Sequence, residues 1–396
     1  MKFILAALAL MFGAMQAPAQ QPQQQQQARP PAPRTYSQTD LWERTSDRIT
    51  FRLGAISFPT NAGPTRLNRI VEASHQGQGL DNALLYYSPD EQVFVTIYIY
   101  APGLPDAGLT AFMTDHAIHI SSGPDLRILR SGLVAAGGVE GAAIRTDYAG
   151  ARDQRLASSA AFTRVGRWIL KLRVSGPEAR RAEVEATMAT LLSEVRFVGR
   201  IEPTADTRIA ASDCPRGADR AARMMSMDGA DALDDAILSI FLEGRNNGDD
   251  GQAEVPRAPR RGSDWCRSTG FTIPDMGGAT PVLRATDTGT GDDRRRSVLF
   301  ALIADNGTLL EVAERRFRNR TRYVLIHHQI GRTMVLGAYD SVPTDAQLAD
   351  ILTGRDEAGA RARATIEIQA SGDSSVNMLV PMTVPATPAP ANRPST

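Results

Sequence analysis

The alternation of hydrophobic and polar residues in the first half of the chain predicts an antiparallel sheet. Residues 82–87 and 92–100 are rich in aromatic and β-branched side chains, and the turn sequence Ser-Pro-Asp-Glu at 88–91 separates them. This arrangement predicts a β-hairpin. Within residues 93–100 both alternating sets are mostly apolar. A strand of that kind is typically covered on both faces, so we expect helices to pack on the sheet.

Two helices and further strands are predicted after this hairpin. One helical stripe consists of Leu109, Phe112, Met113, His116 and Ile120. Strands are predicted at residues 126–135, 140–148, 155–163 and 168–174. A second helix is expected over residues 178–192, with Pro177 placed to open it, and a short strand follows at 195–198. The apolar face of the second helix consists of Val184, Met188, Leu191 and Leu192.

The end of this first block carries a resemblance to a known fold. The strand Trp-Ile-Leu-Lys-Leu-Arg-Val at 168–174 is followed by Gly-Pro at 176–177 and by a helix that ends Leu-Leu-Ser-Glu-Val-Arg-Phe at 191–197. This pattern resembles the α/β/α sandwich of the Mog1/PsbP/DcrB-like superfamily. The resemblance implies an antiparallel sheet between helices and mostly non-catalytic accessory roles. It carries no shared catalytic residues, and fold analogy alone does not give a function.

The second half of the chain predicts a helix and a four-stranded antiparallel meander. The helix spans residues 224–243, with Leu233, Ile237, Ile240 and Phe241 at core spacing, and a polar loop follows at 246–251. The strands are expected at residues 297–304, 308–317, 323–329 and 333–339, and Asp-Asn-Gly at 305–307 is a strong hairpin signal. A final helix is expected to start at residues 343–345. The fold class is therefore α+β in two domains, the first a sheet sandwiched by helices and the second a meander with flanking helices.

Composition divides the chain into five segments. Residues 1–19 combine Lys2, an apolar run and the small pair Ala17 and Ala19, which predicts a signal peptide cut after Ala19. Residues 20–40 are expected to be a disordered Gln/Pro-rich spacer, 41–200 the first domain, 212–355 the second domain, and 356–396 a largely disordered Pro/Thr-rich tail. We therefore expect a periplasmic or secreted protein, and no later segment is long and apolar enough for a transmembrane helix.

Charge and cysteine content narrow the picture further. The chain has 44 basic and 44 acidic residues, so its charge does not favour nucleic acid. Lys2 and Lys171 are its only lysines. Cys214 and Cys266 are its only cysteines, and an isolated pair in an oxidising compartment is expected to form a disulfide. Neither cysteine has a neighbouring His or a C-x-x-C partner, which argues against a reactive thiol.

The polar residues give weak catalytic signals. His116 and His119 have a helical spacing that can place two imidazoles on one metal, with His75 or Asp115 as a distant third ligand, but packing is the simpler interpretation. Neighbours His327 and His328 should point to opposite faces of a strand. Ser121-Ser122-Gly123 fits a helix exit better than a nucleophile. Gly289-Thr290-Gly291 lacks the rest of a phosphate loop, and the pairs Asp234-Asp235, Asp249-Asp250 and Asp292-Asp293 lack calcium-loop spacing. We expect no cofactor or metal.

Arginines form the most suggestive patch. Arg315, Arg316, Arg318, Arg320 and Arg322 crowd one predicted hairpin end. Guanidinium groups suit phosphate and carboxylate, so an anionic envelope component or another envelope protein is a candidate partner, while a solvated hairpin rim is the simpler alternative. The sequence favours a non-enzymatic accessory or binding protein of the bacterial cell envelope. The alternatives are a periplasmic hydrolase with a site around His116 or His328 and a purely structural envelope component. The sequence leaves the oligomeric state open.

Overall fold

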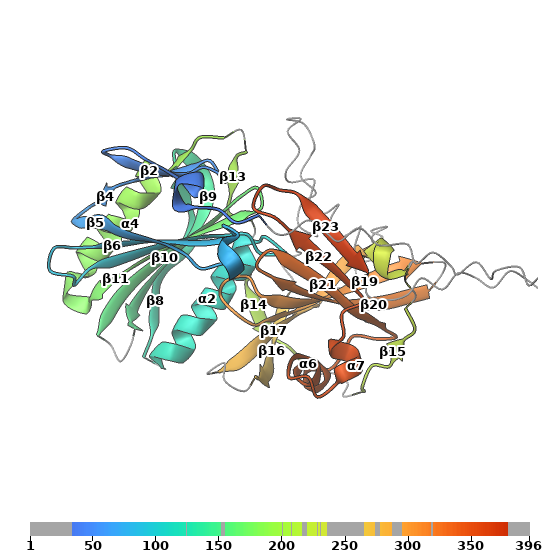
Figure 1. Cartoon of the computed structure of the whole chain (residues 1–396). Helices are drawn as coiled ribbons and strands as arrows, with labels where there is room; N and C mark the ends of the chain where they lie inside the picture. Colours follow the sequence, from blue (N-terminus) through green and yellow to red (C-terminus); the bar gives the residue numbers. More distant parts are fainter. Residues whose placement is uncertain are drawn as a thin grey trace, which may run out of the picture. The chain divides into compact units, whose positions relative to one another are not determined.

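Most of the described chain lies in antiparallel sheets. The computed structural model describes residues 34–378 except 124, 152–154, 200, 207, 216–219, 228, 230, 236–264, 274–277, 287–294 and 318–319. The predicted signal peptide and most of the predicted spacer lie outside these residues. Within residues 33–396, which form one unit, two large sheets and one small sheet are present, with few helices (Figure 1). The fold is therefore mixed and mainly antiparallel, as the sequence predicts.

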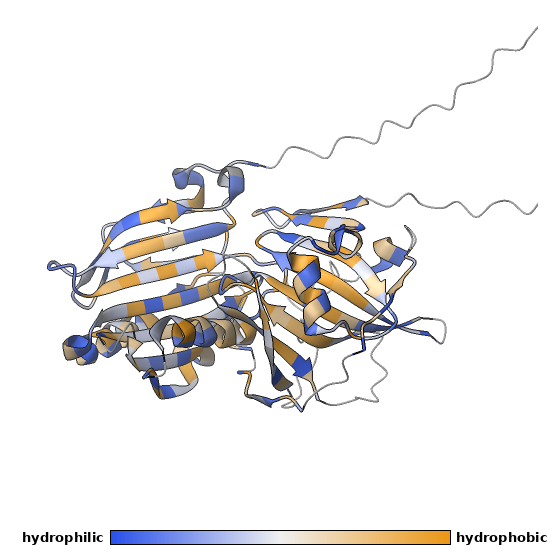
Figure 2. Cartoon of the chain, turned by 90° about the horizontal axis from the view of Figure 1, so that it is seen from below, coloured by the Kyte–Doolittle hydropathy of each residue, from blue (hydrophilic) through white to orange (hydrophobic). Residues whose placement is uncertain are grey.

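The first large sheet has nine strands. In spatial order its main path is β4 (Asn61–Ala62), β5 (Thr65–Glu72), β6 (Asp81–Tyr87), β7 (Phe94–Tyr100), β11 (Trp168–Pro177), β10 (Leu156–Val165), β9 (Val139–Gly150) and β8 (Arg127–Ala136), and β13 (Pro203–Thr204) pairs with β10. The predicted hairpin is the antiparallel pair β6–β7. Hydrophobic and hydrophilic residues alternate along several strands of the chain (Figure 2). Strand β8 ends the main path, because it pairs with β9 on one side only.

Helices cover the two faces of this sheet. Helix α2 (Ala107–Ser122) packs on β9 and β10, and α4 (Arg181–Glu194) packs on β10 and β11, with the 3-10 helix η2 (Glu178–Arg180) before it (Figure 1). Side chains of β10 alternate between the two interfaces: Ala160 and Phe162 belong to the α2 core cluster, and Ala157 and Ala161 belong to the α4 core cluster. The four apolar residues predicted for the second helix are all buried. Both interfaces are thus built from one period-two pattern.

Most of the predicted apolar stripe of α2 packs against the second sheet and not against the first. The residues of α2 that pack on the first sheet include Ala107, Ala111 and Ile118. From the predicted stripe, Leu109, Phe112 and Met113 instead join a cluster with Trp265, Leu283 and Phe300 of the second block. Ile120 is exposed. Small residues allow the helix to approach the first sheet closely, so its large side chains are available to the second sheet.

A small sheet lies on the α4 side, and only its last strand, at the short strand predicted for 195–198, was expected from the sequence. It consists of β1 (Trp42–Arg44), β2 (Arg48–Phe51), β3 (Ile56–Pro59) and β12 (Arg196–Phe197). Before it, Ser37 caps α1 (Gln38–Leu41) through a capping box, and Tyr36 is buried. The last residues of the predicted spacer at 20–40 are therefore part of the folded chain. The 3-10 helix η1 (His75–Gly77) precedes β6.

The second block forms a ten-stranded sheet rather than only a four-stranded meander. Its main path is β14 (Ala211–Asp213), β16 (Trp265–Thr272), β17 (Ala279–Ala285), β18 (Arg295–Leu302), β19 (Leu309–Phe317), β20 (Arg320–Gln329), β21 (Arg332–Tyr339), β22 (Ala364–Ile368) and β23 (Ser374–Met378), and β15 (Met224–Met225) pairs with β21. Strands β18 to β21 are the predicted meander. The other strands were not predicted; four of them, β14, β15, β22 and β23, have two to five residues.

Two sequence predictions for this block need correction. Met224 starts strand β15 and not a helix, although residues 231–235 are helical. Helix α6 (Asp345–Leu352) begins at the predicted position, with Thr344 as its cap. It is not the final element, because α7 (Glu357–Ala360), β22 and β23 follow. The predicted disordered tail at 356–396 is therefore ordered from 356 to 378. Residues 379–396 lie outside the described part.

Besides the α2 side chains, a loop and strand β11 of the first sheet contact two hairpin turns of the second sheet. The backbone N–H of Gly103 donates to the carbonyl of Gln329 at 2.7 Å, and the N–H of Gly331 donates to the carbonyl of Ala101 at 2.8 Å. From the turn between β18 and β19, Asp305 pairs with Lys171. These bonds join the first sheet to the β18–β19 and β20–β21 turns.

Candidate functional site

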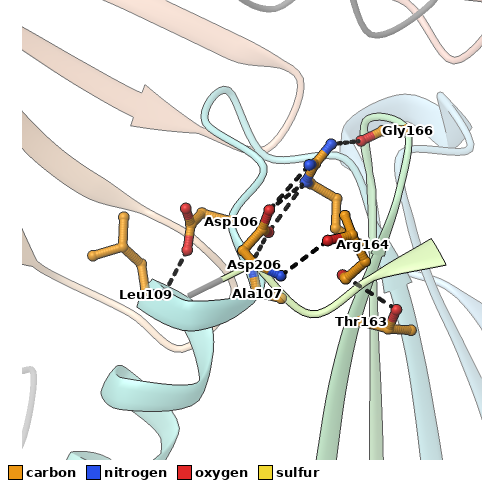
Figure 3. Close-up of polar contacts among 8 residues, drawn as sticks. Asp106, Ala107, Leu109, Thr163, Arg164, Gly166 and Asp206 are labelled. Carbon is orange, nitrogen blue, oxygen red and sulfur yellow. Dashed lines mark hydrogen bonds and ion pairs between the residues drawn. The ribbon is translucent and has the colours of Figure 1, made fainter. Parts of the chain in front are cut away.

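A clamp of acidic residues fixes the start of helix α2 (Figure 3). The carboxylate of Asp106 accepts the N–H of Leu109 at 2.7 Å and caps the helix. Asp206, which follows β13, accepts the N–H of Ala107 at 3.0 Å and pairs with Arg164 at 3.0 Å. Asp206 adopts a φ of 55°, an uncommon backbone conformation outside glycine. All of these groups are partnered within the chain, so we assign the clamp a positioning role.

The two histidines of α2 have different surroundings. His116 Nε2 lies 2.8 Å from the carbonyl oxygen of Ala279, and burial lowers the pKa of its imidazole. His119 is exposed at the helix end. Ser121 donates to the carbonyl of Ile118, as expected at a helix exit. Across the described part of the chain, no three His, Cys, Asp or Glu side chains are placed to hold one metal ion.

The neighbouring histidines of β20 have different surroundings. His328 is fully buried, with Nε2 2.9 Å from Glu311 and Nδ1 3.1 Å from the Thr333 hydroxyl. The other oxygen of Glu311 accepts from Ser297. Burial lowers the pKa of His327 to about 4, and electrostatic repulsion from neighbouring cationic side chains such as Arg332 adds to this effect. The structure therefore brings together a carboxylate, an imidazole and a hydroxyl from the three consecutive strands β19, β20 and β21.

Buried polar pairs also line the α2 side of the first sheet. Tyr148 donates a hydrogen bond to Asp115, and burial raises the pKa of Asp115 to about 6. Lys171 is 4% exposed, lies over the ring of Tyr98 and pairs with Asp305. Burial lowers the pKa of Lys171, and Asp305 partly offsets this effect. No sequence motif marks these pairs, because each joins separate strands, helices or turns.

The predicted arginine patch divides into buried and exposed members. Arg315 and Arg322 are buried and pair with Asp235 at 2.6 Å and 3.3 Å. Arg316 is exposed and lies 3.4 Å from Glu314, and Arg320 is exposed. Arg318 lies outside the described residues. Because buried pairing neutralises two of the guanidinium groups, the anion-binding potential of this hairpin is smaller than the sequence suggests.

Of the remaining acidic pairs, only Asp234-Asp235 lies within the described residues. Asp234 is exposed, while its neighbour Asp235 serves the two buried arginines. The pairs at 249–250 and 292–293, and the glycine loop at 289–291, lie outside the described residues. The predicted disulfide between Cys214 and Cys266 is confirmed, and it links β16 to the residue that follows β14.

An exposed edge is the feature that best fits a binding site. Strand β8 leaves Ile128, Leu129 and Leu133 with 52%, 46% and 59% of their surface in solvent. Most strands of a folded sheet bury such residues, and an exposed hydrophobic edge favours pairing with another chain. Two bulges, at Ile128/Arg130 and Val134/Ala136, interrupt its pairing with β9. A regular edge therefore remains at residues 130–134.

The two faces of β8 differ in chemistry. On the α2 side, Leu133 lies beside Ile144, and Ser131 hydrogen bonds to Thr146 at 3.0 Å. On the α4 side, Arg130 lies beside Asp147, with 3.6 Å between its Nε and the carboxylate. Helix α2 packs on β9 and β10. Ile128 and Leu133 consequently face solvent, whereas Val134 packs against the α4 core cluster.

The sequence predicts the strand at 126–135 but not its edge position. Its pattern, Arg-Ile-Leu-Arg-Ser-Gly-Leu-Val-Ala-Ala over 127–136, lacks a clean alternation. This irregular pattern indicates that the strand is not buried on one face, because its three large apolar residues and two arginines do not alternate. Only the strand order shows that β8 ends the sheet.

Comparisons with known proteins place the chain in no family. No family model matches it, and no curated protein matches it. Among solved structures, it is similar to the solution structure of cyanobacterial PsbP (CyanoP) from Synechocystis sp. PCC 6803. That similarity has 13% identity and a TM-score of 0.29, and covers 39% of this chain and 94% of the other. A similarity of this strength carries no argument about function.

Proposed function

We propose that this chain is a non-enzymatic binding protein of the bacterial cell envelope that holds a protein partner at strand β8. The observation that carries the proposal is the exposed edge at Arg127–Ala136, where Ile128, Leu129 and Leu133 extend into solvent. Addition of a strand to a free edge is a common mode of peptide recognition. The internal pairing of the other polar candidates supports binding over catalysis.

The proposal includes export and a fold relationship. The pattern of residues 1–19 supports a signal peptide cut after Ala19, and the Cys214–Cys266 bridge fits an oxidising compartment. Helices α2 and α4 on opposite faces of the first sheet support a Mog1/PsbP-like sandwich for the first block. Among the described residues, no helix has the length and apolar character needed to cross a membrane.

Site-specific photo-crosslinking tests the proposed function. A benzoylphenylalanine at Leu133 of the full chain, expressed in a bacterium with an intact envelope, should capture a discrete protein that the same probe at Val198 does not capture. Val198 is a matched control because its side chain is 67% exposed. Identical products from the two positions, or none from Leu133, would contradict a partner at β8. N-terminal sequencing of the exported chain tests the cut after Ala19.

A hydrolase is the second candidate, and one arrangement favours it. Thr333, His328 and Glu311 have the order hydroxyl, imidazole, carboxylate used in nucleophilic catalysis. All three are buried, and Gly103 of the first block lies over Thr333, so a substrate would need this loop to move. Hydrolysis of p-nitrophenyl acetate by the full chain, lost in His328→Gln, would support this candidate. Equal rates in both proteins would exclude it.

A further inference from the structure

The free edge of β8 carries a charge pattern that defines its occupant. Arg127 and Arg130 are exposed on this strand, which contains no acidic residue. Arg127 lies opposite Ala149 and Arg130 opposite Asp147, so both arginines belong to the α4 side. Ile128 lies opposite Tyr148 and Leu133 opposite Ile144, which places these two apolar residues on the α2 side. Leu129 lies in the bulge and has no partner on β9, and Val134 packs against the α4 core cluster. The other exposed side chains of the edge are therefore basic on the α4 side and apolar on the α2 side.

The positive charge is only partly neutralised inside the protein. Asp147 is buried and lies 2.9 Å from Arg145, and it also accepts a hydrogen bond from Ser159. Arg130 reaches the same carboxylate only at 3.6 Å, and its side chain is 58% exposed. One carboxylate therefore serves two guanidinium groups. An added strand with acidic residues on this face would gain a favourable cross-strand charge interaction.

A second copy of this chain fits the edge less well. If two β8 strands paired, four arginines would lie along the strand–strand interface, and neither strand would supply a carboxylate. Like charges on neighbouring strands destabilise pairing. A partner strand that alternates acidic and apolar residues avoids this cost, because successive side chains of a strand point to opposite faces.

We propose that the occupant of the β8 edge is an extended protein segment in which Asp or Glu alternates with apolar residues. This inference rests on the proposed function. The segment adds a strand along β8 that pairs regularly beside residues 130–134 and continues past the bulge at Ile128/Arg130 as far as Arg127. Its acidic side chains approach Arg127 and Arg130, and its apolar side chains cover Leu133 and Ile128.

Peptide binding to the mature full chain tests this pattern directly. The probe is a fluorescein-labelled peptide of about seven residues that alternates glutamate and valine, a length typical of single strands. One control peptide has lysine in place of glutamate, and another has the same composition with the glutamates in one block. Fluorescence anisotropy should detect the alternating peptide, with a Kd that rises as salt screens the charges. The two control peptides should bind at least about tenfold more weakly, which corresponds to about 1.4 kcal/mol.

Surface variants localise the binding. Arg127→Glu and Leu133→Asn change exposed side chains, so the fold should tolerate them, which circular dichroism checks. Together they should weaken binding of the alternating peptide about tenfold, as expected for a few cross-strand contacts. The matched controls Arg361→Glu and Val198→Asn, also exposed, should leave the Kd unchanged.

The outcomes separate this inference from the proposed function. Equal binding of the alternating and control peptides, or of the β8 variants and wild type, would overturn the inference. Sedimentation showing a dimer that Leu133→Asn abolishes would also overturn it, in favour of pairing between copies. If the peptide fails while Leu133 still crosslinks a protein partner, the proposed function stands and the acidic pattern is wrong. If crosslinking also fails, both are wrong.

Discussion

Removing the disulfide between Cys214 and Cys266 should destabilise the second block strongly. The bridge joins the end of β14 to β16, and β14 is a three-residue strand that pairs in parallel with β16. The N–H of Cys214 also donates to the carbonyl of Arg267 at 2.9 Å. So short a parallel pair supplies little stability of its own, because few hydrogen bonds oppose the entropy of the chain.

The magnitude follows from the size of the ring. The two cysteines are separated by 52 positions. Closing a ring of that size removes about 14 cal/mol/K of entropy from the unfolded chain, which is about 4 kcal/mol at 25 °C. In urea unfolding with an m value of about 2 kcal/mol/M, the midpoint should fall by about 2 M.

The measurement compares three proteins by urea unfolding. These are the oxidised wild type, the wild type under reducing conditions, and the double variant Cys214→Ser with Cys266→Ala. The reduced wild type lacks the bridge but keeps both cysteine side chains, of which Cys266 is 5% exposed. The difference in unfolding free energy between it and the double variant therefore measures the packing contribution of these side chains. The m value should rise without the bridge, because the unfolded chain expands. A loss below about 1 kcal/mol in both comparisons would refute the ring-closure reasoning.

Three further changes test other parts of the fold, each by urea unfolding. Asp305→Ala should lower the free energy of unfolding by about 2–4 kcal/mol, because it leaves Lys171 buried without its carboxylate. Lys171→Met should change it by less than about 1 kcal/mol, and equal losses would contradict this interpretation of the pair. The raised pKa of Asp115, about 6, means that the folded protein binds this proton more tightly than the unfolded chain, so its contribution to stability is present at acid pH and is lost as the pH rises through 6. Asp115→Asn should therefore gain about 1–3 kcal/mol over wild type between pH 4 and pH 7, and a pH-independent difference would argue against a raised pKa. Gly103→Ala should lower the free energy of unfolding by about 1–3 kcal/mol, because the added Cβ would lie 2.7 Å from the backbone carbonyl oxygen of Arg332. Gly132→Ala has open space around its Cβ and should be nearly neutral, and similar effects at both glycines would contradict the close packing around Gly103.

Local patterns in the sequence predicted the strongly periodic elements. The hairpin β6–β7, helix α4 and the strands β18 to β21 were found because their apolar residues repeat with the period of one strand or one helix. The Asp-Asn-Gly turn at 305–307 marked the β18–β19 hairpin. The disulfide was also predictable, because the chain has only two cysteines. These properties depend on neighbouring residues or on composition.

Pairings between distant segments were decided by the tertiary structure. Tertiary packing placed Ala107, Ala111 and Ile118 of α2 against the first sheet, and Leu109, Phe112 and Met113 against the second. It also brought Arg315 and Arg322 to Asp235, which removed two cations from the predicted patch. Because a side chain binds whatever the fold places beside it, no sequence pattern fixes such contacts.

The candidate site shows the same division. Residues 126–135 predicted a strand, and the composition placed arginines and large apolar residues in it. That β8 lies at the end of its sheet, with exposed arginines on one side and exposed apolar residues on the other, depends on the order of strands and the register with β9. Sequence periodicity specifies which residues of a strand share a face, whereas the exposure of that face depends on which distant segments cover it.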